Sequence, residues 1–256
     1  MVASIIIVSI REIIMIKIDS FSSFFVANWK LNGNFKFIDQ FIDEINIPQN
    51  KSKCIVICPT SIHLDNLSNK KKNFLIGAQN ISQHKEGAFT GEISSDSLLE
   101  LNIDFCIVGH SERRKIFFEK NIDINQKSSQ LISNSIIPIV CIGETLEEKN
   151  NGKTYEILEK QLKDSIADSS NASNTIIAYE PIWAIGSGST PSLEEIDATH
   201  KFIRTHINKY NNYKILYGGS VNSSNSKEIL SLANVNGVLI GGASLKSKEF
   251  TKIIQD

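Results

Sequence analysis

Eight short, almost continuous apolar runs recur along this chain between residues 24 and 240. They occupy residues 24–27, 54–58, 74–78, 105–108, 136–142, 175–179, 214–217 and 237–240. Runs that are apolar on both faces are typical of parallel strands covered by helices. The chain is therefore expected to form an α/β fold built on a parallel sheet.

Segments of helical periodicity lie between these runs. Apolar residues recur at steps of three and four in three of them: Phe37, Ile38, Phe41, Ile42 and Ile45; Tyr155, Leu158, Leu162 and Ile166; Ile196, His200, Ile203, Ile207 and Tyr210. A capping box at residues 192–195 marks the start of the third helix. Eight strands, seven crossover segments and a last amphipathic helix (Phe250, Ile253, Ile254) predict a (β/α)₈ TIM barrel.

We expect residues 21–256 to form one catalytic barrel domain, because no long linker divides them and 256 residues suit a single α/β barrel. Residues 1–20 are interpreted as an amino-terminal extension with no assigned function. Their apolar stretches are interrupted by Arg11 and Glu12, so they are too short and too charged to span a bilayer. They also lack a secretory signature, and Met15 is an alternative start.

The net charge and the cysteines limit which classes of function and which cellular compartment the sequence favours. The net charge is −1 and the charged fraction is 21%. This balance argues against broad binding to nucleic acid or to an acidic membrane. The four cysteines (Cys54, Cys58, Cys106, Cys141) lie in apolar runs without zinc-type spacing, so we expect buried free thiols in a reducing, cytoplasmic compartment.

Polar residues and glycine pairs follow several of the predicted strands. Asn28 and Lys30 follow the first, His110 the fourth and Glu180 the sixth. Glycine pairs follow the last two strands, at 218–219 and 241–242. In a barrel these positions converge on one mouth, where glycine-rich loops commonly bind phosphate. The set predicts proton-transfer chemistry on an anionic ligand.

The segment from Ala178 to Gly188 combines a strand-end carboxylate, Glu180, with a rigid proline, an apolar tip and a Gly-Ser-Gly hinge. An apolar loop with small residues at its end is suited to close over a site and to expel water. Residues 181–188 are therefore predicted to form a lid, and Trp183 is predicted to pack within it. The alternative is a surface loop whose tryptophan fills a gap in the core.

The sequence resembles the triosephosphate isomerase family over about residues 24–255. The runs that carry the resemblance are Asn28-Trp29-Lys30, Val108-Gly109-His110-Ser111-Glu112-Arg113-Arg114, the segment 178–186, Tyr217-Gly218-Gly219-Ser220-Val221, and shorter matches at 77–80, 87–92 and 141–145. The resemblance implies an isomerase that interconverts dihydroxyacetone phosphate and D-glyceraldehyde 3-phosphate through an enediol(ate), in glycolysis and gluconeogenesis. It implies no cofactor and no metal.

The resemblance also assigns roles to residues. Glu180 would be the base, and its burial is expected to raise its proton affinity. His110, just before a helix start, would polarise the carbonyl as a neutral imidazole. Lys30 and Asn28 would act on the substrate oxygen and the phosphate. The phosphate would lie on the backbone of the glycine-rich segments, at Gly186, Ser220, Gly241 and Gly242. The resemblance assigns supporting roles to Ser111, Glu112 and Thr90.

The long segment from Gln79 to Glu92 suggests an assembly. It exceeds an ordinary strand–helix connection and carries Phe89 at its tip. In the family this segment projects into a partner subunit, with Thr90 near the neighbour's site, which implies a homodimer. The alternative is an exposed surface loop.

Two residues depart from the family pattern, and two further features have structural interpretations. Phe118 stands where glycine is usual and Ser187 where threonine is usual. The run Glu112-Arg113-Arg114 is either a buried ion network or a charged helix start. Cys141 and Glu144 are expected to pack and hydrogen-bond behind the site.

Two other functions remain open from the sequence. A Schiff-base aldolase would require a lysine on an inner strand, whereas Lys30 lies at a strand end. A non-catalytic binding barrel would have lost Glu180 or the lid segment, and both are present.

Overall fold

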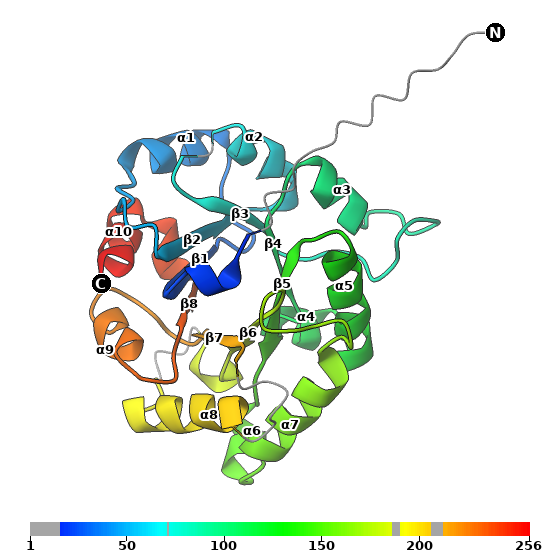
Figure 1. The fold of residues 1–256 in the computed structure, drawn as a ribbon, viewed down its shortest axis with the longest axis vertical. Helices are drawn as coiled ribbons and strands as arrows, with labels where there is room; N and C mark the ends of the chain where they lie inside the picture. The colour runs from blue at the N-terminus through cyan, green and yellow to red at the C-terminus, as the bar shows by residue number, and fades with distance from the viewer. Residues whose placement is uncertain (1–15, 71, 186–189, 206–211) are drawn as a thin grey trace, which may run out of the picture.

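A computed structural model describes residues 16–70, 72–185, 190–205 and 212–256. Eight parallel strands close into a barrel, and helices surround it (Figure 1). The strands are β1 (Ser23–Asn28), β2 (Lys53–Cys58), β3 (Leu75–Ala78), β4 (Phe105–Val108), β5 (Ile137–Ile142), β6 (Ile176–Tyr179), β7 (Lys214–Tyr217) and β8 (Gly237–Ile240). Each strand pairs with the next, and β8 returns to β1, where Phe24 lies opposite Gly237. The predicted TIM barrel is confirmed, and each predicted strand agrees with the structure within one residue at either end.

The helices are amphipathic and cover the outside of the barrel. They are α1 (Phe35–Glu44), α2 (Leu64–Ser68), α3 (Ser95–Glu100), α4 (Ser111–Ile116), α5 (Asn121–Ser133), α6 (Leu146–Asn150), α7 (Thr154–Ser165), α8 (Leu193–Thr205), α9 (Ser226–Leu230) and α10 (Ser247–Gln255). Short 3₁₀ turns span Ile18–Ser20, Ser61–His63, Ile182–Ala184 and Gly242–Leu245. The predicted stripes at 155–166 and 196–203 bury Leu158, Leu162, Ile196 and Ile203, while Ile207 and Tyr210 lie outside the described residues.

The capping box predicted before α8 is confirmed. The N–H of Glu195 donates to the Ser192 hydroxyl oxygen at 3.2 Å, and the N–H of Ser192 donates to the Glu195 carboxylate at 2.8 Å. Reciprocal bonds of this kind satisfy amide groups that a helix start otherwise leaves unpaired.

Two apolar layers form the core. One fills the barrel interior and the other lies between the strands and the helices. All four cysteines are buried thiols, as expected. Within the described ranges, no helix is long and apolar enough to cross a membrane.

The chain just before β1 packs under the barrel. Ile18 is fully buried in the interior layer with Phe24 and Leu239. The N–H of Ser22 donates to the Ser52 carbonyl at 2.7 Å, and Lys214 donates to the Phe21 carbonyl at 3.2 Å. Ile18 thus lies at the amino-terminal end of the strands, opposite the end where they deliver polar residues. Residues 1–15 of the predicted extension lie outside the described residues.

Candidate active site

A cavity of about 200 Å³ opens at the carboxyl ends of the strands. Its lining includes Asn28 and Lys30 after β1, His110 after β4 and Glu180 after β6. The glycine-rich segments after β7 and β8 complete it with Gly218, Gly219, Ser220, Gly241 and Gly242. The fold therefore brings the predicted strand-end residues together. Gly186 and Ser187 lie outside the described residues.

Glu180 is held in a buried position, with 2% of the residue exposed. Its N–H donates to the Ile142 carbonyl at 2.7 Å. Its side chain accepts a bond from the Ser111 N–H at 3.1 Å, and the other carboxylate oxygen lies 3.1 Å from His110 Nε2. A Cβ atom on Gly143 would lie 1.7 Å from the Glu180 carbonyl oxygen, so glycine alone permits this approach of β5 to β6.

The charge state of Glu180 reflects two opposing influences. Burial raises the pKa of Glu180, whereas the charge and hydrogen bond of His110 and the bond from the Ser111 N–H lower it. The net pKa lies below the ordinary value of 4.5. Burial thus raises the proton affinity of Glu180, as expected, but in this arrangement His110 and the Ser111 N–H together outweigh it.

His110 occupies the position just before α4, and its ring nitrogens have different partners. When the ring is neutral, Nδ1 accepts a bond from the Glu112 N–H at 3.2 Å, which requires that Nδ1 carry no proton. Nε2 then carries the proton and faces Glu180. Burial lowers the pKa of His110, but the carboxylates of Glu180 and Glu112 raise it by more. The pKa of His110 therefore lies above its ordinary value.

Lys30 adopts a left-handed backbone with φ 51°, which is unfavourable for a residue with a side chain. Both of its peptide groups are held: its N–H donates to Asn28 Oδ1 at 3.0 Å, and its carbonyl accepts from Gln79 Nε2 at 2.9 Å. Lys30 Nζ lies 2.5 Å from Glu112 Oε1. Gln79 was not predicted as a site residue, although its place directly after β3 could have identified it.

The residues after β7 face the segment that follows Glu180. The Ser220 hydroxyl donates to the Ala184 carbonyl at 2.6 Å. A Cβ atom on Gly218 would lie 2.8 Å from Glu180 Cγ. The proposed anion-binding backbone and the carboxylate of Glu180 therefore share one narrow space, in which Ile185 is a further apolar wall.

The charged run at 112–114 does not form one network. Glu112 pairs with Lys30, Arg113 with Glu119 at 2.5 Å, and Arg114 donates to the Gly109 carbonyl at 2.8 Å and the Cys141 carbonyl at 2.9 Å. Each side chain thus fixes a different neighbour of the site.

Glu144 lies behind the site, as expected, and it is almost fully buried. Its side chain accepts bonds from the Trp183 indole N–H at 2.8 Å and from the Tyr179 hydroxyl at 3.3 Å. Burial raises the pKa of Glu144, and these hydrogen bonds offset only part of the increase. Glu144 therefore ties together residues on either side of Glu180.

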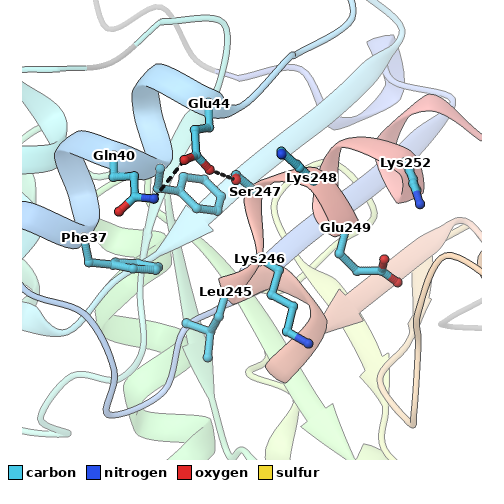
Figure 2. Close-up of a pocket in the computed structure, with 10 residues that line it drawn as sticks. Phe37, Gln40, Glu44, Leu245, Lys246, Ser247, Lys248, Glu249 and Lys252 are labelled. Carbon is cyan, nitrogen blue, oxygen red and sulfur yellow. Dashed lines mark hydrogen bonds between the residues drawn. The ribbon is translucent and has the colours of Figure 1, made fainter.

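A second hollow of about 500 Å³ lies away from the mouth, between α1 and α10 (Figure 2). It mixes lysines with the carboxylates of Glu44 and Glu249, and Glu44 accepts bonds from Gln40 and Ser247. None of the strand-end residues contributes to it. The predicted strand-end residues line the cavity at the mouth instead.

Comparisons with known proteins agree with this geometry. The family model for triosephosphate isomerase matches residues 23–256. A triosephosphate isomerase from Mesomycoplasma hyorhinis is 44% identical over 236 residues, which are 90% of this chain and 96% of that protein. One from Francisella tularensis subsp. mediasiatica is 42% identical over 239 residues, covering 90% and 94%. The chain belongs to the triosephosphate isomerase family.

Two predicted features can now be placed on a triosephosphate isomerase barrel. Phe118, where the family usually has glycine, has φ 58°, which accounts for the usual glycine. Thr90 is exposed on the connection between β3 and α3 and does not line the cavity of its own chain.

Proposed function

We propose that Glu180 is the base with which this chain interconverts dihydroxyacetone phosphate and D-glyceraldehyde 3-phosphate, an aldose–ketose isomerisation of glycolysis and gluconeogenesis. Membership of the triosephosphate isomerase family supports the reaction. The observation that carries the residue assignment is the buried contact of 3.1 Å between Glu180 and His110, beside Lys30 and two glycine-rich segments.

The proton transfer follows from these contacts. Glu180 removes a proton from the carbon beside the carbonyl and returns it to the neighbouring carbon, while His110 hydrogen-bonds the substrate oxygens through Nε2. The proton of the substrate hydroxyl moves to the former carbonyl oxygen, so the carbonyl changes carbon with no net gain or loss of protons. When Glu180 turns from His110 to the substrate, it loses the interactions that lower its pKa while burial continues to raise it. The carboxylate thus becomes a stronger base at the moment it is needed.

Lys30 supplies the positive charge of the site. Its ammonium can face both the phosphate and the negative charge that develops on the enediolate. Asn28 fixes the Lys30 backbone and lines the cavity. The N–H groups of Gly241 and Gly242 and the Ser220 segment are proposed to bind the phosphate. Gly186 is proposed to assist from outside the described residues. The N–H groups of Ser111 and Glu112 hold the side chains of Glu180 and His110, respectively.

Schiff-base chemistry is the less favourable alternative. An imine requires a lysine whose nitrogen is free to attack the carbonyl, whereas Lys30 lies at a strand end and its Nζ is held 2.5 Å from Glu112 Oε1. Borohydride added with substrate should therefore trap no adduct.

A coupled assay with glyceraldehyde 3-phosphate tests the proposed reaction directly. Glu180→Gln should lower kcat at least about a thousandfold while inorganic phosphate still protects the protein against heat. Glu100→Gln, an exposed change on α3, is the matched control. A loss of tenfold or less in Glu180→Gln would show that another group is the base.

We further propose that the chain is a homodimer. Exposed apolar side chains follow each of the first four strands: Leu31 (93%), Ile62 (79%), Phe89 (42%), Phe117 (61%) and Phe118 (79%). All five follow the carboxyl ends of parallel strands and so lie toward the same end of the barrel, and exposed apolar side chains gathered on one face are typical of an interface. The connection between β3 and α3 reaches outward from the barrel (Figure 1), and Thr90 on it would approach a partner.

Sedimentation velocity at micromolar concentration tests the assembly. Phe89→Glu should release monomers, whereas Glu86→Gln on the same connection should not. An active wild-type monomer would contradict the proposal.

We also propose residues 21–256 as the catalytic domain and, from the buried thiols, a cytoplasmic location. Fractionation of cells would test the location.

A further inference from the structure

Trp183 lies between two residues that line the cavity, Glu180 and Ile185. Its 3₁₀ turn makes one backbone bond to the loop after β5, from the Ile182 N–H to the Glu144 carbonyl at 3.0 Å. Its indole N–H also bonds to the Glu144 side chain. The position of the Trp183 ring therefore affects the positions of both Glu180 and Ile185.

A second group holds the same ring from its face. Lys149, on α6, places its ammonium 3.6 Å from the centre of the Trp183 ring. The ammonium is itself directed by Glu195, whose carboxylate lies 2.9 Å away. Glu195 is fixed by the capping box with Ser192 at the start of α8. The Lys149 side chain thus joins Trp183, in the connection from β6 to α8, to Glu195 on α8 itself.

From these contacts we infer that Lys149 is a positioning residue for the reaction, which holds Trp183 and through it the orientation of Glu180 and Ile185. The inference rests on the proposed function. An isolated exposed ion pair between Lys149 and Glu195 would contribute little. The ring contact adds attraction, and a cation over a tryptophan face contributes about 0.5–1 kcal/mol at exposed sites.

Removal of the Lys149 ammonium should make the segment around Trp183 less ordered before substrate binds. In Lys149→Ala, α6 keeps a good helix former, but Trp183 loses the contact on its face. The segment around Trp183 must then be ordered at the expense of substrate binding energy. We expect KM to rise about two- to fivefold, which corresponds to the strength of a cation–π contact, with kcat changed less than twofold.

Trp183 fluorescence provides a readout that needs no substrate. The chain has two tryptophans, and Trp29 is fully buried, so acrylamide quenching reports mainly on Trp183. Lys149→Ala should increase the quenching constant about twofold. Lys149→Arg, which keeps a cation over the ring, should restore wild-type quenching and KM. Glu195→Gln should give intermediate values, because the lysine loses its anchor.

Lys160→Ala, an exposed change on the neighbouring α7, is the matched control. The inference is overturned if Lys149→Ala matches Lys160→Ala in quenching and KM, or if Lys149→Arg fails to restore them. A lowered melting temperature with unchanged quenching would also overturn it, because that result describes a merely structural lysine. Failure of the wild-type assay would instead contradict the proposed function, and the quenching comparison would still test Lys149.

Discussion

At the scale of single residues, the reactivity of Glu180 depends on what it touches. Its folded pKa is below 4.5 because His110 and the Ser111 N–H outweigh burial. A depressed carboxylate pKa contributes stability above the unfolded pKa, and this contribution is lost as the pH falls through the folded pKa. The same pair therefore sets an acid limit for both activity and stability.

The pH profile of kcat/KM tests this balance. In the wild type the acid limb should lie below pH 4.5. In His110→Gln the limb of the residual activity should move to higher pH, because the largest lowering influence is gone and burial remains. Lys115→Ala, an exposed change on α4, is the control. An unmoved limb in His110→Gln would contradict the assigned cause.

Phe118 illustrates strain at a single residue. Its φ of 58° places Cβ close to the following carbonyl, and its side chain is largely exposed. Phe118→Gly should be more stable than Phe118→Ala by about 1 kcal/mol, since both lose the ring and only glycine relieves the backbone. Urea denaturation of the two variants measures the difference. Equal stability would mean that the backbone relaxes without strain.

At the scale of elements, the strands were predictable and their side-chain partners were not. Periodicity identified all eight strands because each is apolar on both faces. The pair Lys30–Glu112 joins residues 82 positions apart, and Gln79 reaches Lys30 across 49 positions. Such contacts depend on the twist and closure of the barrel, which local pattern does not encode. The left-handed backbone of Lys30 likewise follows from tertiary bonds.

The β5–β6 contact provides an element-scale test. Gly143→Ala would force the loop after β5 away from the Glu180 carbonyl, where a Cβ atom has 1.7 Å of space. A displacement of the base by about 1 Å is expected to lower kcat about a hundredfold. Gly242→Ala, where nothing lies within 4 Å of the added atom, should leave the melting temperature unchanged. A fully active Gly143→Ala protein would show that β5 does not position Glu180.

At the scale of the whole molecule, the barrel separates its two ends. The residues proposed to carry the chemistry lie at the carboxyl ends of the strands, and the chain just before β1 packs against the opposite end. Family resemblance begins at residue 23, so Ile18 falls outside the matched region although it is fully buried. This separation predicts that changes under the barrel affect stability and leave the chemical step alone.

Ile18→Ala tests that separation. Removing most of a buried isoleucine side chain leaves a cavity among Phe24, Leu239 and their neighbours, and such truncations lower the free energy of unfolding by about 2–5 kcal/mol. Ile18→Val, which removes one methylene, should lose only about 0.5–1.5 kcal/mol. Urea denaturation gives both values, and kcat and KM should stay within twofold of wild type. A loss below about 0.5 kcal/mol in Ile18→Ala would show that residues 16–22 only rest against the barrel. A large fall in kcat with a folded protein would show instead that the two ends are coupled through the interior layer.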